Sequence, residues 1–338
     1  MNKKRVLAML LAGAMALSMT ACGGNSASTD GSSNDSGASA SGGSYKVSVI
    51  LKTLAAEYWQ YVKSGAEDYA SEHSDKVTVE VKGPSSETAF DEMQNMIETD
   101  LSSGSYDGVI ISPLQSDTAA QLVSGTKLPI VAIDTNFTAP EVKSFVGTGN
   151  EAAAKKGGEA AVEAAKAAGW TDIKCIEIAG VQGDQTNTAR MNGYKAGVEE
   201  AGGTFLSDEV QYADATADRA TTAMEAIMQT HPEGIAIICA NNDDMAMAAA
   251  RAAQGHDAYK NTIFIGFNGD RAACEAILAG QMTMSVAQMA YEMGYKAVET
   301  MVQVLDGETV DEFVDSGSDV VTPDNAQERL DTLKTQLH

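Results

Sequence analysis

Polar side chains with planar end groups recur where apolar runs of this 338-residue chain stop. Carboxylates and amides present hydrogen-bond donors and acceptors in fixed geometry. Such groups suit vicinal hydroxyls, each of which donates once and accepts twice. The positions of interest at these run ends include Asp134, Asn242, Asn268 and Gln288, together with the ammonium of Lys52. Their chemistry favours a neutral polyhydroxy ligand over an anion.

An aromatic pair, Tyr58 and Trp59, follows the first of these positions at the start of a predicted helix. A flat ring can cover the apolar C–H face of a sugar while amides hold its edge. Trp59 also shares a helical face with Val62, Ala66 and Tyr69, so packing in the core is the alternative interpretation.

Short apolar patterns alternate with longer amphipathic ones from Tyr45 onward. The predicted strands cover residues 46–52, 76–82, 107–112, 128–134, 144–149, 172–180, 234–241, 261–268 and 282–288, and the predicted helices cover 56–72, 86–103, 150–168, 186–201, 216–230, 242–254, 270–279 and 289–306. This alternation predicts an α/β fold with parallel sheets. One sheet of this size would be unusual, so we expect two lobes. Ligands of such folds bind beyond the carboxyl ends of the strands.

The first residues resemble a bacterial lipoprotein signal. The basic stretch 3–5 precedes an apolar run at 6–19, and Cys22 follows Met19-Thr20-Ala21. We expect removal of a signal peptide, 1–21, and acylation of Cys22; an ordinary signal peptide is the alternative. Residues 22–44, rich in Gly and Ser, predict a flexible tether. The mature domain is then expected to be extracytoplasmic, anchored by lipid at the cell surface or in the periplasm.

The net charge weighs against nucleic acid as a partner. The formal charge is −24, and it becomes −27 without the three basic residues of the signal. A phosphate backbone or an anionic membrane would be repelled by such a surface.

Sequence motifs of enzymes and metal sites are absent. The four histidines have no zinc-ligand spacing, and the chain has neither a GxSxG motif nor a phosphate-binding Walker loop. We therefore expect no metal, no cofactor and no catalysis. Cys175, Cys239 and Cys274 lie in or beside apolar segments. Buried free thiols are expected, with one disulfide among the three left open.

The segment VILKTLAAEYWQYVKSGAEDYA resembles the first strand and helix of periplasmic sugar-binding proteins of the ribose/allose type. GVIISPLQSD, PIVAIDTN, TARMNGY, ICANNDDMAMAAARA, FIGFNGD and AGQMTMSVAQ extend the resemblance, in the family's order, over residues 45–323. It implies two lobes joined by a three-strand hinge, with sugar in the cleft between them. Lobe one would be 45–148 plus 289–317 and lobe two 149–288 plus 318–338, with crossings near Thr148, Gln288 and Val320.

The resemblance also implies a set of ligand-binding residues. Lys52 would donate to a hydroxyl, Asp134 would grip two hydroxyls and Arg190 would reach into the cleft. The full set is Lys52, Tyr58, Trp59, Asp134, Arg190, Asn242, Asn268 and Gln288. Asn268 stands where many relatives have aspartate, and residues 213–219 lack an aromatic found in relatives. The ligand is therefore expected to differ from ribose and allose.

The function implied by the resemblance is that of a monomeric solute-binding lipoprotein. It would capture a monosaccharide or polyol and deliver it to an ABC permease. Two alternatives remain open from the residues. One is an extracellular glycoside hydrolase with Asp134 as one acid, and the other is a protein that presents its ligand to a membrane sensor.

Overall fold

The computed structural model describes residues 44–337. The predicted signal peptide at 1–21, the predicted lipidation site Cys22 and tether residues 23–43 lie outside the described residues. Within 44–337, no helix is long and apolar enough to cross a membrane.

The first sheet has six strands in the order β12-β5-β4-β3-β1-β2, and all its pairs are parallel. We call this sheet with its helices lobe one. Its strands are β1 (Tyr45–Ile50), β2 (Val77–Lys82), β3 (Gly108–Ile111), β4 (Ile130–Ile133), β5 (Val142–Gly147) and β12 (Phe313–Asp315), and its helices are α1 (Glu57–Glu72), α2 (Phe90–Ser102), α3 (Ser116–Val123) and α9 (Ala290–Leu305). Alternate side chains of its central strands pack against α1 and α9 on one face, and against α2 and α3 on the other. This burial on both faces explains the nearly continuous apolar runs.

The second sheet follows the order β13-β11-β10-β9-β6-β7, with β8 also paired to β6. We call this sheet with its helices lobe two. Its strands are β6 (Lys174–Ala179), β7 (Thr204–Phe205), β8 (Gln211–Tyr212), β9 (Ile237–Ala240), β10 (Ile263–Asn268), β11 (Met284–Gln288) and β13 (Ser318–Val321), and its helices are α4 (Asn150–Ala167), α5 (Gln185–Glu200), α6 (Ala217–Thr230), α7 (Asp243–Ala253), α8 (Arg271–Leu278) and α10 (Ala326–Gln336), with 3-10 turns at Ser207–Glu209 and Asp257–Tyr259. β13 runs antiparallel to β11, and the other pairs are parallel. Helices α4 and α5 cover one face of this sheet, and α6, α7 and α8 cover the other.

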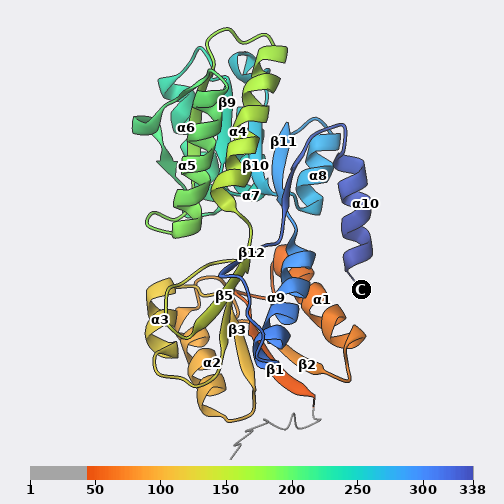
Figure 1. Cartoon of the computed structure of the whole chain (residues 1–338). Helices are drawn as coiled ribbons and strands as arrows, with labels where there is room; N and C mark the ends of the chain where they lie inside the picture. The colour runs from red at the N-terminus through yellow and green to blue at the C-terminus, as the bar shows by residue number, and fades with distance from the viewer. Residues whose placement is uncertain (1–43, 338) are drawn as a thin grey trace, which may run out of the picture. The chain divides into compact units, whose positions relative to one another are not determined.

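The chain passes between the two sheets three times within residues 44–337. The passages follow β5, β11 and β12, and each is at most two residues long (Figure 1). The hydroxyls of Thr148 and Ser316, in the first and third passages, lie 3.4 Å apart. Asp315 accepts hydrogen bonds from the backbone N–H groups of Gly149 and Gly317, so these two passages are held together.

Close helix packing fixes the helices that carry the candidate site. A Cβ atom on Gly65 of α1 would lie 1.9 Å from the carbonyl oxygen of Tyr291, and one on Gly294 of α9 would lie 1.9 Å from that of Val62. Only glycine permits this approach of two backbones. On lobe two, Gly193 of α5 meets α4 in the same way.

The structure confirms the predicted α/β class and the two lobes built on parallel sheets. All nine predicted strands are present, while α3, α10 and four strands of two to four residues were not predicted. Cys175, Cys239 and Cys274 are buried free thiols, as expected. The sulfur atoms of Cys175 and Cys239 lie 3.3 Å apart, in hydrogen-bonding contact and not joined by a disulfide.

Candidate functional site

Asp134 follows the last residue of β4, and three neighbouring side chains contact its carboxylate. Its backbone has a φ of 63°, a conformation that costs energy for a residue with a side chain and is common at functional sites. Tyr58 donates its hydroxyl to Oδ1 over 2.8 Å, and Thr135 donates to Oδ2 over 2.8 Å. The Lys52 ammonium lies 3.8 Å from Oδ2. Three predicted site residues, Lys52, Tyr58 and Asp134, therefore meet at the carboxyl ends of β1 and β4.

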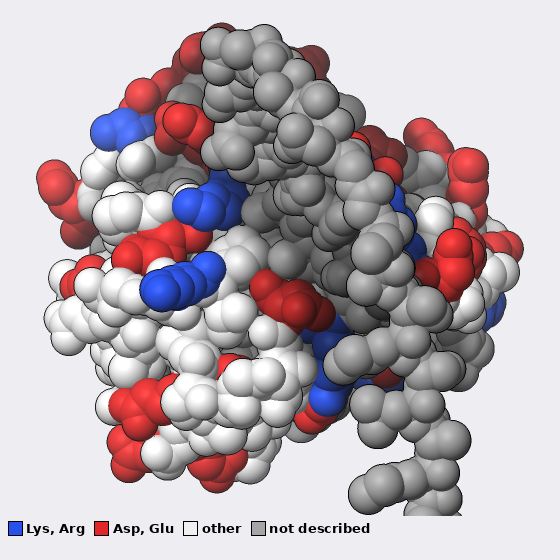
Figure 2. All heavy atoms as spheres, turned by 60° about the horizontal axis from the view of Figure 1, so that its bottom comes forward, with Lys and Arg blue, Asp and Glu red and all other residues white. Residues whose placement is uncertain are grey.

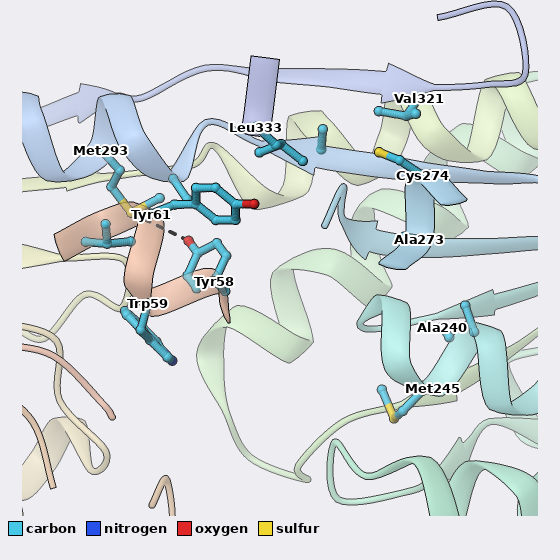
Figure 3. Packing of buried hydrophobic residues seen from close by; sticks show 14 of the residues in the cluster. Tyr58, Trp59, Tyr61, Ala240, Met245, Ala273, Cys274, Met293, Val321 and Leu333 are labelled. Carbon is cyan, nitrogen blue, oxygen red and sulfur yellow. Dashed lines mark hydrogen bonds between the residues drawn. The ribbon is translucent and has the colours of Figure 1, made fainter. Parts of the chain in front are cut away.

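The two aromatic residues at the start of α1 have different surroundings. Figure 3 shows Tyr58 and Trp59 leaving the helix in different directions, with the Tyr58 hydroxyl turned toward Met293. Burial, followed by the charge of Asp134, raises the pKa of Tyr58 well above its ordinary value, so the hydroxyl stays a donor. Trp59 is 3% exposed, and its indole N–H donates to Glu87 over 2.8 Å. Their role in stacking on a ligand stays a prediction.

Arg190 extends from α5 into the interior and is 7% exposed. Its Nε donates to Asn150 Oδ1 over 2.7 Å, and its Nη1 donates to the carbonyl of Asn241 over 2.9 Å. The guanidinium carbon lies 3.9 Å from the ring centroid of Phe267, a cation–π arrangement. The guanidinium is thus held through Nε and Nη1, and Nη2 donates to no residue within 44–337. Burial lowers the pKa of Arg190, and the charge of Asp134 opposes that effect.

A buried acid, Glu177 on β6, lies near enough to Arg190 for the charge of Arg190 to lower its pKa slightly. It is 0% exposed, and Asn241 donates to its Oε1 over 3.3 Å, while its Oε2 has no partner among the described residues. Burial raises its pKa to about 8, against smaller opposing effects of Asn241 and Arg190. Glu177 is therefore mostly protonated at neutral pH. Glu177 therefore does not neutralise the positive charge of Arg190.

Asn268 and Gln288 lie at the carboxyl ends of the adjacent strands β10 and β11. Gln288 donates its amide to Asn268 Oδ1 over 2.9 Å. Asn268 donates in turn to Asp270 Oδ2 over 3.4 Å. The φ of Asn268 is 135°, the second strained backbone position at a strand end of the site. The structure thus brings these two predicted residues together and adds Asp270 to them.

Asn242 combines capping with a contact to a neighbouring loop. Its Oδ1 accepts from the backbone N–H of Met245 over 2.9 Å, which caps α7. Its amide nitrogen donates to the carbonyl of Ala215. The capping residue of α7 is thus Asn242 itself, and its role in binding a ligand stays a prediction.

Side chains of the two lobes also act on one another. The charges of Arg190 and Asp270, both on lobe two, affect the pKa of Tyr58 on lobe one. At the edge of this region, Arg271 Nε lies 2.5 Å from Glu57 Oε1, an ion pair between α8 and α1. The strand ends of both sheets thus present donors and acceptors to one shared region.

Three residues of this region were not in the predicted set. Asn150 and Phe267 orient Arg190, and Asp270 ends the amide chain from Gln288. Asn150 follows a predicted strand, and this position could have pointed to it. Nothing in the sequence indicates the ring under Arg190.

The described residues bear on two further kinds of site, one for a metal ion and one for a polyanion. No group of three His, Cys, Asp or Glu residues that could hold a metal ion occurs within 44–337. On the face drawn in Figure 2, basic side chains stand among acidic ones and form no continuous basic patch.

Comparisons with known proteins agree with this geometry. Residues 47–309 match the model of the periplasmic binding protein domain. The D-allose-binding periplasmic protein of Escherichia coli (strain K12) is 30% identical over 264 residues, which cover 75% of this chain and 82% of that protein. The ribose import binding protein of Bacillus subtilis (strain 168) is 26% identical over 274 residues, covering 80% and 85%.

Solved structures support the same fold. A carbohydrate transporter solute-binding protein from Agrobacterium radiobacter, in complex with D-arabinose, superimposes with a TM-score of 0.75 at 23% identity, covering 87% of this chain and 99% of that one. With its two parallel-sheet lobes and a family match over most of its length, the chain belongs to the periplasmic binding protein family, whose members bind substrates.

Proposed function

We propose that this chain captures a neutral monosaccharide or polyol between its lobes and delivers it to an ABC permease. The observation that carries the proposal is that Asp134 on lobe one and Arg190 on lobe two lie close enough for the charge of Asp134 to act on Arg190. Asp134 offers acceptors at one sheet edge, and Arg190 offers Nη2 donors at the other. A hydroxylated ring between them would satisfy both, since each hydroxyl donates once and accepts twice.

The charge balance of the site supports a neutral ligand. Lobe one contributes Lys52 and Asp134, and lobe two contributes Arg190 and Asp270. Neither sign dominates, so a free anion or cation would meet one repelling partner on each side. The names of the relatives, which refer to allose, ribose and arabinose, agree with this class.

The mechanism would be hinge closure. The rigid bodies would be 45–148 plus 289–317 and 149–288 plus 318–338, turning about the three short passages between the sheets. The membership of each sheet supports this division. Closed protein would be recognised by the permease, and micromolar affinity, about −8 kcal/mol, would leave release possible. We infer that the chain acts as a monomer and without catalysis.

Membrane attachment belongs to the same proposal. Cys22, after a basic and apolar leader, would carry the lipid, and the Gly/Ser-rich tether would let the domain reach a permease. Fractionation of expressing cells tests this point. The chain should sediment with membranes, and Cys22→Ala should release it or block its processing. Equal sedimentation of both forms would contradict lipidation at Cys22.

A melting experiment tests the binding function. We would melt the purified protein with D-allose, D-ribose, D-arabinose and myo-inositol. A ligand at about one hundred times its Kd adds about 2.7 kcal/mol of stability, which is readily resolved. At least one compound should raise the Tm of the wild type, and Asp134→Ala should abolish the shift. Equal shifts in both proteins would place binding elsewhere.

A further inference from the structure

Asp270 lies two residues beyond the end of β10, at the start of α8, but its side chain does not form the hydrogen bond usual for that position. It is the N-cap residue of α8, where aspartate normally accepts a backbone hydrogen bond of the first turn. Here the side chain makes no such bond. Its backbone N–H donates to Asp243 Oδ2 over 3.1 Å, so the main chain is fixed while the carboxylate is directed elsewhere.

The carboxylate of Asp270 is poorly satisfied by the protein. Asn268 donates to Oδ2 over 3.4 Å, a long hydrogen bond. The other oxygen, Oδ1, accepts no hydrogen bond from residues 44–337. The oxygen of the Asn268 amide already accepts from Gln288, so the chain of amides ends on this acid.

No described cation neutralises Asp270. Lys52 pairs with Asp134, and Arg271 pairs with Glu57. Arg190 is tied by its Nε and Nη1 to lobe two. Asp270 is only partly buried, so its free oxygen is open to a donor from outside the protein.

The position of Asp270 is at the boundary between the lobes. Its charge acts on Tyr58 and Tyr61 of α1, and the charge of Glu57 acts on it. Tyr58 is the residue that donates to Asp134. Burial, and then the charges of Asp243, Asp244 and Glu57, raise the pKa of Asp270 well above its ordinary value. The acid therefore gains from a new hydrogen-bond donor on the side of lobe one.

We propose that Asp270 is a ligand-contacting residue whose free carboxylate oxygen accepts a hydroxyl from the ligand edge that faces lobe two. It is the counterpart of Asp134 on the opposite lobe, and together they select neutral polyols over sugar acids. This inference rests on the proposed function of the cleft.

Substitutions at Asp270 and at one matched control test the proposal by calorimetric titration. Asp270→Asn keeps size and remains a good N-cap, and Asp270→Ala removes the acceptor. Glu275→Gln removes an exposed acid from the same helix. The neutral probes are D-allose, D-ribose, D-glucose and myo-inositol. For each one that binds the wild type, both Asp270 variants should raise Kd at least about ten-fold, the range of a hydrogen bond to a charged group. Glu275→Gln should leave Kd within about two-fold.

Anionic counterparts test the selectivity. D-ribonate and D-glucuronate place a carboxylate in the same cleft, so the wild type should bind each more weakly than the matching sugar. Asp270→Asn should narrow that difference in affinity, and more so at higher pH, because the pKa of Asp270 is raised and only its ionised form repels the ligand carboxylate. An unchanged difference would overturn the selective role.

Two results would overturn the proposal in different ways. Neutral probes that bind the wild type and both Asp270 variants equally well would remove Asp270 from the ligand contacts and leave the proposed function intact. A wild type that binds none of the neutral probes would contradict the proposed function and this inference with it.

Discussion

Glu177 gives the sharpest prediction about stability, because its carboxyl group is fully buried near Arg190 and one of its oxygens has no partner within residues 44–337. Its pKa is about 8 in the folded protein against 4.5 for an ordinary glutamate. Folding therefore favours the protonated form. The contribution to stability is complete below pH 4.5 and declines as pH rises toward 8.

The magnitude follows from the same two pKa values. At 1.36 kcal/mol for each pKa unit, the rise from 4.5 to about 8 corresponds to a loss on the order of 5 kcal/mol between pH 4.5 and 9. Glu177→Gln is neutral at every pH and retains an acceptor for Asn241. It should be close to the wild type at pH 5 and more stable by several kcal/mol at pH 9.

Urea denaturation at pH 5, 7 and 9 measures this difference directly. Other titrating groups act equally in both proteins. The way in which the difference in unfolding free energy changes with pH therefore isolates the effect of Glu177. Glu275→Gln, which removes an exposed acid, should show no comparable trend. A difference in unfolding free energy between Glu177→Gln and the wild type that stays constant from pH 5 to pH 9 would refute the reasoning.

Further substitutions test the contacts around the site. Tyr58→Phe removes the hydroxyl that donates to Asp134 and should lower unfolding free energy by about 1–3 kcal/mol in urea denaturation; an unchanged value would mean that water replaces the bond at no cost. Gly294→Ala forces a Cβ to within 1.9 Å of a carbonyl oxygen of α1. It should cost at least about 2 kcal/mol in the same assay, and a neutral effect would contradict the tight contact of α1 and α9. Arg271→Gln breaks the partly exposed ion pair with Glu57. It should weaken sugar binding by at most about 1 kcal/mol, or five-fold, with the effect fading in high salt, whereas a salt-independent loss would point to a direct ligand contact.

The fold could be read from the sequence because buried parallel strands produce distinctive runs. Segments such as 108–111 and 130–133 are buried at every residue, and their apolar character is continuous. The strands at 204–205 and 211–212 have only two residues each, so they carry no periodic signal. Helix α3 spans eight residues with two of them buried, which left too short a pattern to recognise.

The sequence predicted which residues lie at the site better than it predicted where their side chains point. Position at a strand end placed Lys52 and Asp134 at one edge of the first sheet, and Asn268 and Gln288 at one edge of the second, since the parallel strands of a sheet share a carboxyl edge. Sequence alone does not tell where a side chain turns. The Asn242 amide caps a helix and contacts a loop, and the Trp59 indole binds Glu87.

Asp270 also shows that sequence position alone does not reveal what a side chain contacts. An aspartate before a helix predicts a cap, which hides any other role. Only the absence of the capping bond, together with the amide chain from Gln288 through Asn268, draws attention to its carboxylate.

The central claim is that a neutral sugar or polyol binds between Asp134 and Arg190. Calorimetric titration of the wild type, Asp134→Asn and Arg190→Met with D-allose, D-ribose, D-arabinose and myo-inositol tests it most directly. The account predicts one site per chain, a micromolar Kd for at least one compound and a loss of about one hundred-fold or more in each variant. Binding of undiminished affinity in both variants, or no binding to the wild type by any of the four, would contradict it.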